Sequence, residues 1–207
     1  MKTATNRRGL LKGALVAGAA LAAPTRVFAQ ASALTPRDRA VLDVARIQIE
    51  RVGATLWHRD RAAIADFGVH SAQPRFHFAN LEAGTVRSFL VAHGMGSDPE
   101  HDGWLKTFSN VEGSNATSRG SFITYEWYHG RYGTSIRLGG LDPENSNALP
   151  RAIVAHPAEY ARAEHVATYG RLGRSNGCFA MSPDDFNEAL WNISGGRLIY
   201  SERLGLV

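Results

Sequence analysis

Residues 170–181 of the chain read GRLGRSNGCFAM, and they contain its only cysteine, Cys178. Three glycines in this stretch permit backbone angles that other residues resist, so a tight turn is expected around the sulfur. Arg171 and Arg174 are expected to place positive charge near the sulfur, which favours the reactive thiolate over the thiol. The alternative is a buried and inert cysteine, because free cysteines are among the most buried residues.

The first 29 residues have the pattern of an export signal. Arg7 and Arg8 precede an apolar run over residues 13–23, and Ala29 is a small residue suited to a cleavage position. The run is shorter than the ~20 residues that a membrane-spanning helix needs. Because the segment NRRGLLK resembles a twin-arginine signal, we expect the precursor to use the twin-arginine export machinery. The protein is then expected in the periplasm or at the cell wall, without stable membrane insertion after cleavage.

The charge of the chain lies mostly in this leader. The whole sequence has 23 Lys and Arg against 19 Asp and Glu, and residues 1–29 hold five of the basic residues and no acid. The remaining chain has 18 basic and 19 acidic residues, so its charge gives no argument for nucleic-acid binding. In an oxidising compartment structural cysteines usually come in pairs. A lone thiol there is a candidate nucleophile, with intermolecular pairing as the alternative.

The sequence after the leader predicts a mostly β domain with a helix before it. We expect a tail and helix over residues 30–61 and a catalytic domain over residues 62–207. The helix begins at Thr35-Pro36 and carries apolar residues at three- and four-residue spacing as far as Leu56. A second helix begins at Ser182-Pro183, and residues 158–166 are expected to form a shorter one near the nucleophile. Apolar runs predict strands at 75–81, 86–92, 120–127, 134–138, 151–156 and 197–201.

A cysteine nucleophile needs a base within hydrogen-bond reach, and histidine is the usual choice. His93 and His156 each end an apolar strand-like run, where the rim of a sheet commonly carries a site. His156, 22 residues before Cys178, is the predicted base, and His93 is the reserve candidate. The other histidines are expected at helix surfaces (His58, His165), on loops or strand surfaces (His70, His77, His129), or in a solvated loop (His101).

Zinc binding is the main competing chemistry. His93, His101, Asp102 and His156 are all possible ligands, but they lack the tight spacing by which metal sites are usually recognised. We therefore predict no metal, and no cofactor, because acyl transfer by a thiol needs none.

The run from Ser175 to Cys178, with a strand-ending histidine about twenty residues earlier, resembles the nucleophile motif of YkuD-type L,D-transpeptidases. The resemblance to a divergent branch, the murein L,D-transpeptidase catalytic domain, covers residues 62–202 and includes His93-Gly94 and residues 170–178. Two positions depart from the family pattern. Pro157 stands where the pattern has glycine, and Ala180 stands where it has arginine, a role for which Arg174 or Arg171 is the candidate replacement.

The resemblance implies an L,D-transpeptidase-like β-sandwich that cross-links peptidoglycan by acyl transfer through a cysteine thioester on a tetrapeptide stem. It implies Cys178 as nucleophile, His156 as base, and a turn at Gly177 that aims backbone N–H groups at the oxyanion. The residues expected to contact stem peptides are Ser175, Asn176, Arg174 and His93. Two alternatives stay open: an L,D-carboxypeptidase or wall-protein-releasing hydrolase on the same scaffold, and a non-catalytic peptidoglycan-binding module.

Overall fold

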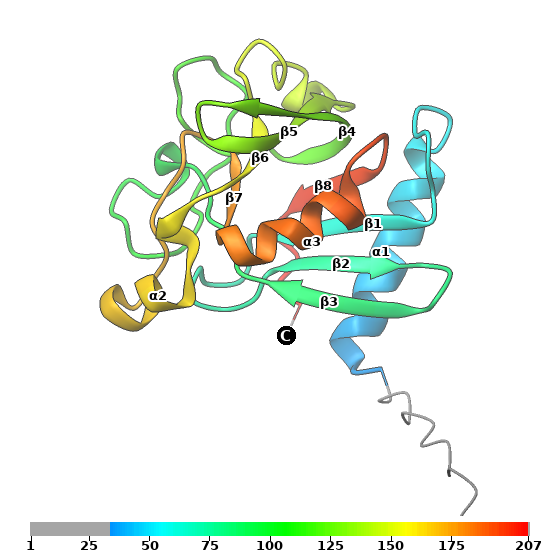
Figure 1. Cartoon of the computed structure of the whole chain (residues 1–207), viewed down its shortest axis with the longest axis horizontal. Coiled ribbons are helices and arrows are strands. Elements are labelled where there is room, and N and C mark those ends of the chain that lie inside the picture. The colour runs from blue at the N-terminus through cyan, green and yellow to red at the C-terminus, as the bar shows by residue number, and fades with distance from the viewer. Residues whose placement is uncertain (1–33, 207) are drawn as a thin grey trace, which may run out of the picture. The chain divides into compact units, whose positions relative to one another are not determined.

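The computed structural model describes residues 34–206, so the predicted leader lies outside the described residues. None of the described helices has the length and apolar character that crossing a membrane requires. In chain order the described elements are α1 (Pro36–Val52), β1 (Arg61–Asp66), β2 (Phe76–Asn80), β3 (Thr85–Phe89), the 3-10 helix η1 (Met95–Ser97), β4 (Gly120–Gly130), β5 (Gly133–Gly140), η2 (Pro143–Asn145), β6 (Val154–Pro157), η3 (Glu159–Ala161), α2 (Ala163–Tyr169), β7 (Phe179–Met181), α3 (Pro183–Ile193) and β8 (Leu198–Glu202) (Figure 1).

The strands form one sheet in the order β3-β2-β1-β8-β4-β5-β6-β7. Neighbouring strands are antiparallel except for the pairs β1–β8 and β6–β7. Beyond the end of β3, Ala92 forms a bridge with Ala180 of β7, so the two edges of the sheet meet and the sheet nearly closes on itself. The predicted mostly β fold, with an N-terminal helix and short helices near Cys178, is confirmed. The strands expected in a sandwich are joined in this single sheet.

Helix α1 packs against one face of the sheet. Thr35 caps it as expected, because its hydroxyl accepts the Asp38 N–H at 3.0 Å and the Asp38 carboxylate accepts the Thr35 N–H at 3.3 Å. The buried residues of the helix pack with β1 through Ala62 and Ile64. The helix ends at Val52, earlier than expected, so His58 lies in an exposed loop and not on a helix surface.

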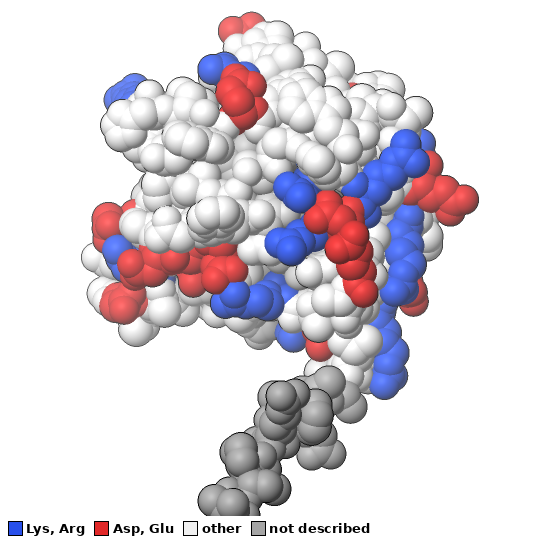
Figure 2. Space-filling model, turned by 45° about the vertical axis from the view of Figure 1, so that its right-hand side comes forward, with Lys and Arg blue, Asp and Glu red and all other residues white. Residues whose placement is uncertain are grey.

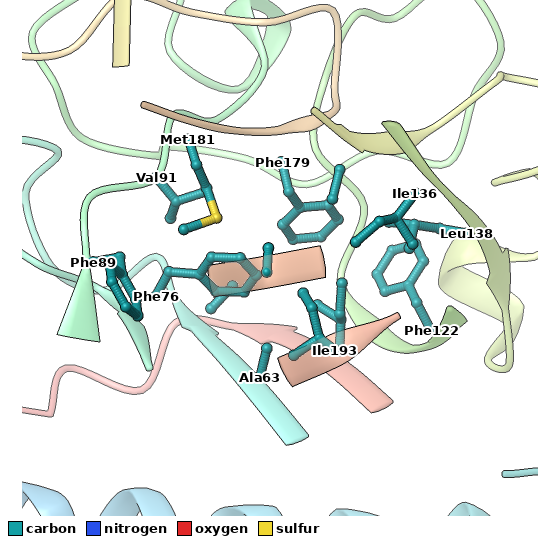
Figure 3. Packing of buried hydrophobic residues seen from close by; sticks show 14 of the residues in the cluster. Ala63, Phe76, Phe89, Val91, Phe122, Ile136, Leu138, Phe179, Met181 and Ile193 are labelled. Carbon is teal, nitrogen blue, oxygen red and sulfur yellow. The ribbon is translucent and has the colours of Figure 1, made fainter. Parts of the chain in front are cut away.

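A second core lies on the opposite face of the sheet. Successive side chains of a strand point to opposite faces, and Ala63 and Ala65 of β1 belong to this core while Ala62 and Ile64 belong to the first. Phe179 reaches into it from β7, with its ring centroid 5.4 Å from that of Phe122 and 6.0 Å from that of Phe76 (Figure 3). Helix α3, capped by Ser182 as predicted, contributes Phe186, Ala189 and Ile193. The residue directly after Cys178 therefore anchors β7 in the core.

Three local expectations differ from the structure. Residues 158–166 form η3 and then α2, because Arg162 between them has extended backbone angles (φ −79°, ψ 156°) that interrupt a helix. The strand expected from Arg151 begins at Val154, because Ala152 has a φ of 52° and leaves the extended region. His77 lies on β2 as expected but is fully buried, with Nδ1 2.8 Å from the hydroxyl of Ser88.

Charged side chains of both signs share the surface. Figure 2 shows Lys and Arg next to Asp and Glu on one face of the molecule. Ion pairs between oppositely charged side chains include Arg87 with Glu188 and Arg197 with Asp60. Pairing of this kind agrees with the near-neutral charge of the chain after the leader.

Candidate active site

Cys178 lies directly before β7, between the glycine of a turn and Phe179, the first residue of the strand. Phe179 points into the core, so Cys178 and Ala180 share the other face of the strand. Cys178 is 7% exposed, and its Sγ lies 3.8 Å from the carbonyl oxygen of Ala152. The sulfur is thus close to the surface but not freely open to it.

The turn before Cys178 is as tight as the glycines predict. The Ser175 hydroxyl donates to the Cys178 carbonyl at 2.7 Å and accepts the Gly177 N–H at 3.1 Å. Gly177 has a φ of 109°, and a Cβ added there would lie 2.6 Å from the carbonyl oxygen of Ala116. Glycine is therefore required at position 177 by both backbone conformation and space.

The segment at His93-Gly94 runs alongside this turn. The Ser175 N–H donates to the His93 carbonyl at 2.9 Å, and the Met95 N–H donates to the Ser175 carbonyl at 2.8 Å. Two motifs that are far apart in the sequence are therefore brought together by backbone hydrogen bonds.

His156 is on the same strand face as the sulfur. In the parallel pair β6–β7 it lies opposite Ala180, which is two residues after Cys178 and shares its face. Its Nδ1 lies 2.9 Å from the Pro157 carbonyl oxygen, which only accepts, so Nδ1 carries the proton and Nε2 is the basic nitrogen. The ring stacks on Tyr132, with centroids 4.5 Å apart. Burial lowers the pKa of His156, and the described residues include no direct hydrogen bond from it to Cys178.

His93 has a different environment from the one predicted. It is 1% exposed, its Nδ1 accepts from Arg75 at 2.7 Å, and its Nε2 donates to Asp98 at 3.2 Å. Burial and the Arg75 charge lower its pKa to about 3. With both ring nitrogens occupied and the side chain buried, His93 has neither a free nitrogen to act as base nor an exposed face for substrate. The geometry supports neither predicted role.

The charge around the sulfur comes from a different arginine than expected. Arg171 donates to the Tyr169 carbonyl at 3.2 Å, and Arg174 donates to the carbonyl oxygens of Asp98 and Pro99. Burial raises the pKa of the Cys178 thiol, whereas the Val154 backbone N–H and Arg151 act to lower it. Burial is the larger effect, so the resting sulfur is a thiol. It is not the thiolate that was expected from Arg171 and Arg174.

Three other residues were predicted to contact the substrate, and two of them reach the surface. Asn176 is exposed and Arg174 is half-buried, so both are able to meet a bound peptide. Ser175 is buried, and its hydroxyl is used within the turn. Arg151 is the residue that sequence reasoning missed. It stands at the start of a run that predicts a strand, and its place close before His156 is the signal that could have pointed to it.

The side chains named as possible zinc ligands do not form a metal-binding cluster. His101 bonds to the Leu172 carbonyl at 3.0 Å, and Asp102 pairs with Lys106. Residues 34–206 include no group of three or more His, Cys, Asp and Glu side chains able to hold a metal. A hollow of about 290 Å³ between α1 and the start of β4 contains none of the candidate site residues, and its lining pairs with itself through Arg51–Asp142 and Arg119–Glu202.

Comparison with protein families decides the assignment of the chain. Residues 37–201 match the family described as YkuD_2, the L,D-transpeptidase catalytic domain. The chain belongs to this family. The match begins within α1, so the helix is part of the matched region, and it includes both Cys178 and His156.

Solved structures are more distantly similar to this chain. An L,D-transpeptidase from Mycobacterium smegmatis is 16% identical with a TM-score of 0.43, over 69% of this chain and 58% of that one. One from Mycobacterium tuberculosis H37Rv is 13% identical with a TM-score of 0.45, over 69% and 57%. The helical cell shape determining protein Pgp2 from Campylobacter jejuni is 14% identical with a TM-score of 0.41, over 82% and 57%. The chain thus spans less than two thirds of each, and no curated protein matches it.

Proposed function

We propose that this family member is a peptidoglycan L,D-transpeptidase in which Cys178 is the nucleophile and His156 the general base. The observation that carries the proposal is the parallel register of β6 and β7, which sets His156 opposite Ala180, two residues after Cys178 and therefore on the same face as it. The free Nε2 of His156 and the shallow burial of the sulfur support these roles. A missing hydrogen bond before substrate arrives is no objection, because such contacts commonly tighten in the substrate complex.

The first half-reaction forms a thioester. Cys178 Sγ attacks the carbonyl carbon between diaminopimelate and D-alanine of a tetrapeptide stem, and the thiol proton passes to Nε2 of His156. The tetrahedral intermediate collapses, the C–N bond breaks, and His156 returns the proton to the departing amine of D-alanine. Because thiol and imidazole are both uncharged at rest, proton transfer accompanies the attack and does not precede it.

The second half-reaction releases the enzyme. A side-chain amine of a neighbouring stem attacks the thioester, the new C–N bond forms, and the C–S bond breaks. His156 accepts the proton of the amine and passes it to the sulfur. Water in place of the amine would make the same site an L,D-carboxypeptidase, and a wall-linked protein as the acylated donor would make it a protein-releasing hydrolase.

The surroundings of Cys178 supply the remaining contacts. The Gly177 N–H already donates to the Ser175 hydroxyl, so the oxyanion is stabilised by another backbone N–H of this turn, an effect commonly worth about 3 kcal/mol per donor. Arg174 pairs with a carboxylate of the stem and Asn176 bonds its amides. The proposal includes export through the leader at residues 1–29, with the enzyme acting on stem peptides in the periplasm or at the cell wall.

The direct test is mass spectrometry of muropeptides after tetrapeptide-rich sacculi are treated with the purified protein. Cys178→Ala runs beside it as the matched control, with thermal melting to verify that the variant is folded. We expect dimers joined from diaminopimelate to diaminopimelate, and none with the variant.

Other outcomes point to the alternatives. Tripeptides without such dimers identify the carboxypeptidase, in which water is the acceptor. Equal retention of the protein on sacculi by wild type and variant, with no change in the muropeptides, identifies a binding module and rejects the enzyme.

A further inference from the structure

Arg151 is a partly buried cation whose hydrogen-bond partners are all neutral. Its Nη1 donates to the Ser109 carbonyl at 2.7 Å and the Ser118 hydroxyl at 2.6 Å. Its Nη2 donates to the Ala116 carbonyl at 2.5 Å and the Ser114 hydroxyl at 3.3 Å. Within residues 34–206 no carboxylate forms an ion pair with it, although most other arginines at the surface have one.

A half-buried charge without an opposite charge is costly, because it has lost water without gaining an ion pair. Burial accordingly lowers the pKa of Arg151, and Cys178 is the one ionisable group that opposes this effect. The relation is mutual, since Arg151 is also the one charged side chain that lowers the pKa of Cys178. The charge therefore has a single counterpart in its surroundings, and that counterpart is negative only when the sulfur is ionised.

The guanidinium also lies against the backbone that carries the sulfur. A Cβ built on Gly177 would be 3.1 Å from Nη2 of Arg151, so the guanidinium borders the space that a side chain at position 177 would fill. The same guanidinium is held by carbonyl and hydroxyl partners within residues 109–118, the segment that passes beside this turn. At position 180, Ala180 is fully buried beside Ala92 and supplies no charge.

We propose that Arg151 is the positioning residue of the nucleophile, a cation that stabilises the Cys178 thiolate through the Gly177 turn in place of an arginine at position 180. It does not touch the sulfur and takes no proton. This inference rests on the nucleophilic role of Cys178 in the proposed function, but not on peptidoglycan as substrate.

The test is the pH dependence of Cys178 alkylation by iodoacetamide, followed by mass spectrometry of the intact protein. The groups that face the sulfur are Arg151, the imidazole of His156 and the phenol of Tyr160, whose own pKa is raised first by burial and then by Cys178. In Arg151→Gln we expect the midpoint of the alkylation profile to rise by about one pH unit, and the rate at neutral pH to fall about tenfold.

Two further variants separate charge from anchoring. Arg151→Lys keeps the charge but loses the forked geometry, so its midpoint should stay within about 0.3 units of wild type if charge is what matters. Arg119→Gln is the matched control, because Arg119 directly follows the same loop but pairs with Glu202. It should leave the profile unchanged.

The outcomes are distinct from those of the muropeptide assay. An unchanged midpoint in Arg151→Gln overturns the inference, as do equal shifts in the Gln and Lys variants, which would mean that the arginine only anchors the loop. If Arg151→Gln does not fold, the test rests on Arg151→Lys alone. A rise of a full pH unit in the alkylation midpoint of Arg151→Lys then rejects the proposal. Because alkylation needs no stem peptide, the proposed substrate is able to fail while this inference stands.

Discussion

His93 and His156 both follow apolar strand-like runs and both are buried, yet their rings are held in different ways. His93 is fixed at both nitrogens by Arg75 and Asp98. His156 is fixed at Nδ1 by a backbone carbonyl, and its flat face lies on Tyr132. Burial and a neighbouring positive charge hold His93 neutral, whereas only burial depresses the pKa of His156.

In the proposed mechanism this difference separates a histidine with a structural role, His93, from one with a chemical role, His156. Arg75 is fully buried and bonds to the carbonyls of Val69 and Val91 as well as to His93, while the Asp98 carboxylate accepts two backbone N–H groups. This cluster fixes the segment whose backbone holds Ser175. His93 thus supports the nucleophile turn from behind, and His156 is left with a nitrogen for proton transfer.

The largest expected effect is the loss of catalysis on removing the free imidazole. His156→Asn removes the base, so the rate of acyl transfer should fall by about 10²- to 10⁴-fold. The melting temperature should change little, because one backbone hydrogen bond and one ring contact are lost. Muropeptide turnover measured per folded molecule checks this.

The reciprocal variant is His93→Asn. It leaves Arg75 and Asp98 buried with a poorly matched partner, so the free energy of unfolding should fall by about 3 kcal/mol in a urea titration. A variant at position 93 that keeps full stability and loses activity as completely as His156→Asn would contradict the comparison.

A smaller effect is expected from pH. The pKa of His93 is lowered to about 3, and that of buried His77 to about 4, in both cases chiefly by burial. Both pKa values lie below that of a histidine in the unfolded chain. At pH values between the folded-state and the unfolded-state pKa, the unfolded chain therefore binds more protons than the folded protein. The contribution of these two neutral histidines to the free energy of unfolding is therefore complete above about pH 6.5 and is lost as the pH falls toward 4. The free energy of unfolding should fall by up to about 1.4 kcal/mol per pH unit for each histidine.

Melting temperatures between pH 7.5 and 4.5 measure this slope. His77→Phe should make the slope shallower, because one of the two histidines is gone. His58→Asn is the control, since His58 is exposed and its replacement should leave the slope as in wild type. A slope that is the same in all three proteins would refute the assignment of the pH effect to buried histidines.

The sequence predicted the elements whose signals are local. The Thr35 and Ser182 caps and the apolar spacing of α1 were recognisable because capping and periodicity act within one or two turns. β1 was not assigned, since its run of alanines has low strand propensity and its burial comes from α1 on one face and the core on the other. β7 was missed because three residues give no periodicity.

In the candidate site, too, residues marked by a local signal were predicted, and residues whose surroundings depend on tertiary contacts were not. Cys178, Gly177 and His156 were predicted because a motif and a strand end mark them. The role of Arg151 depends on residues 109–118 folding over the turn, and the environment of His93 depends on Arg75, 18 positions earlier and directly before β2. Contacts of this kind arise from tertiary packing, which no spacing in the sequence records.

The smallest expected effect concerns Ala152, whose carbonyl faces the sulfur. Its φ of 52° costs an alanine about 1–2 kcal/mol, while glycine there loses about 0.5–1 kcal/mol more chain entropy on folding. Ala152→Gly should therefore stabilise the protein by about 0.5 kcal/mol, measured in urea. Asn115→Gly is the matched control, because it has the same φ but asparagine tolerates that region, so its gain should be smaller. If Ala152→Gly gains stability while acyl transfer slows, the strained backbone is part of what aims the carbonyl at Cys178, and the site depends on rigidity as well as on His156.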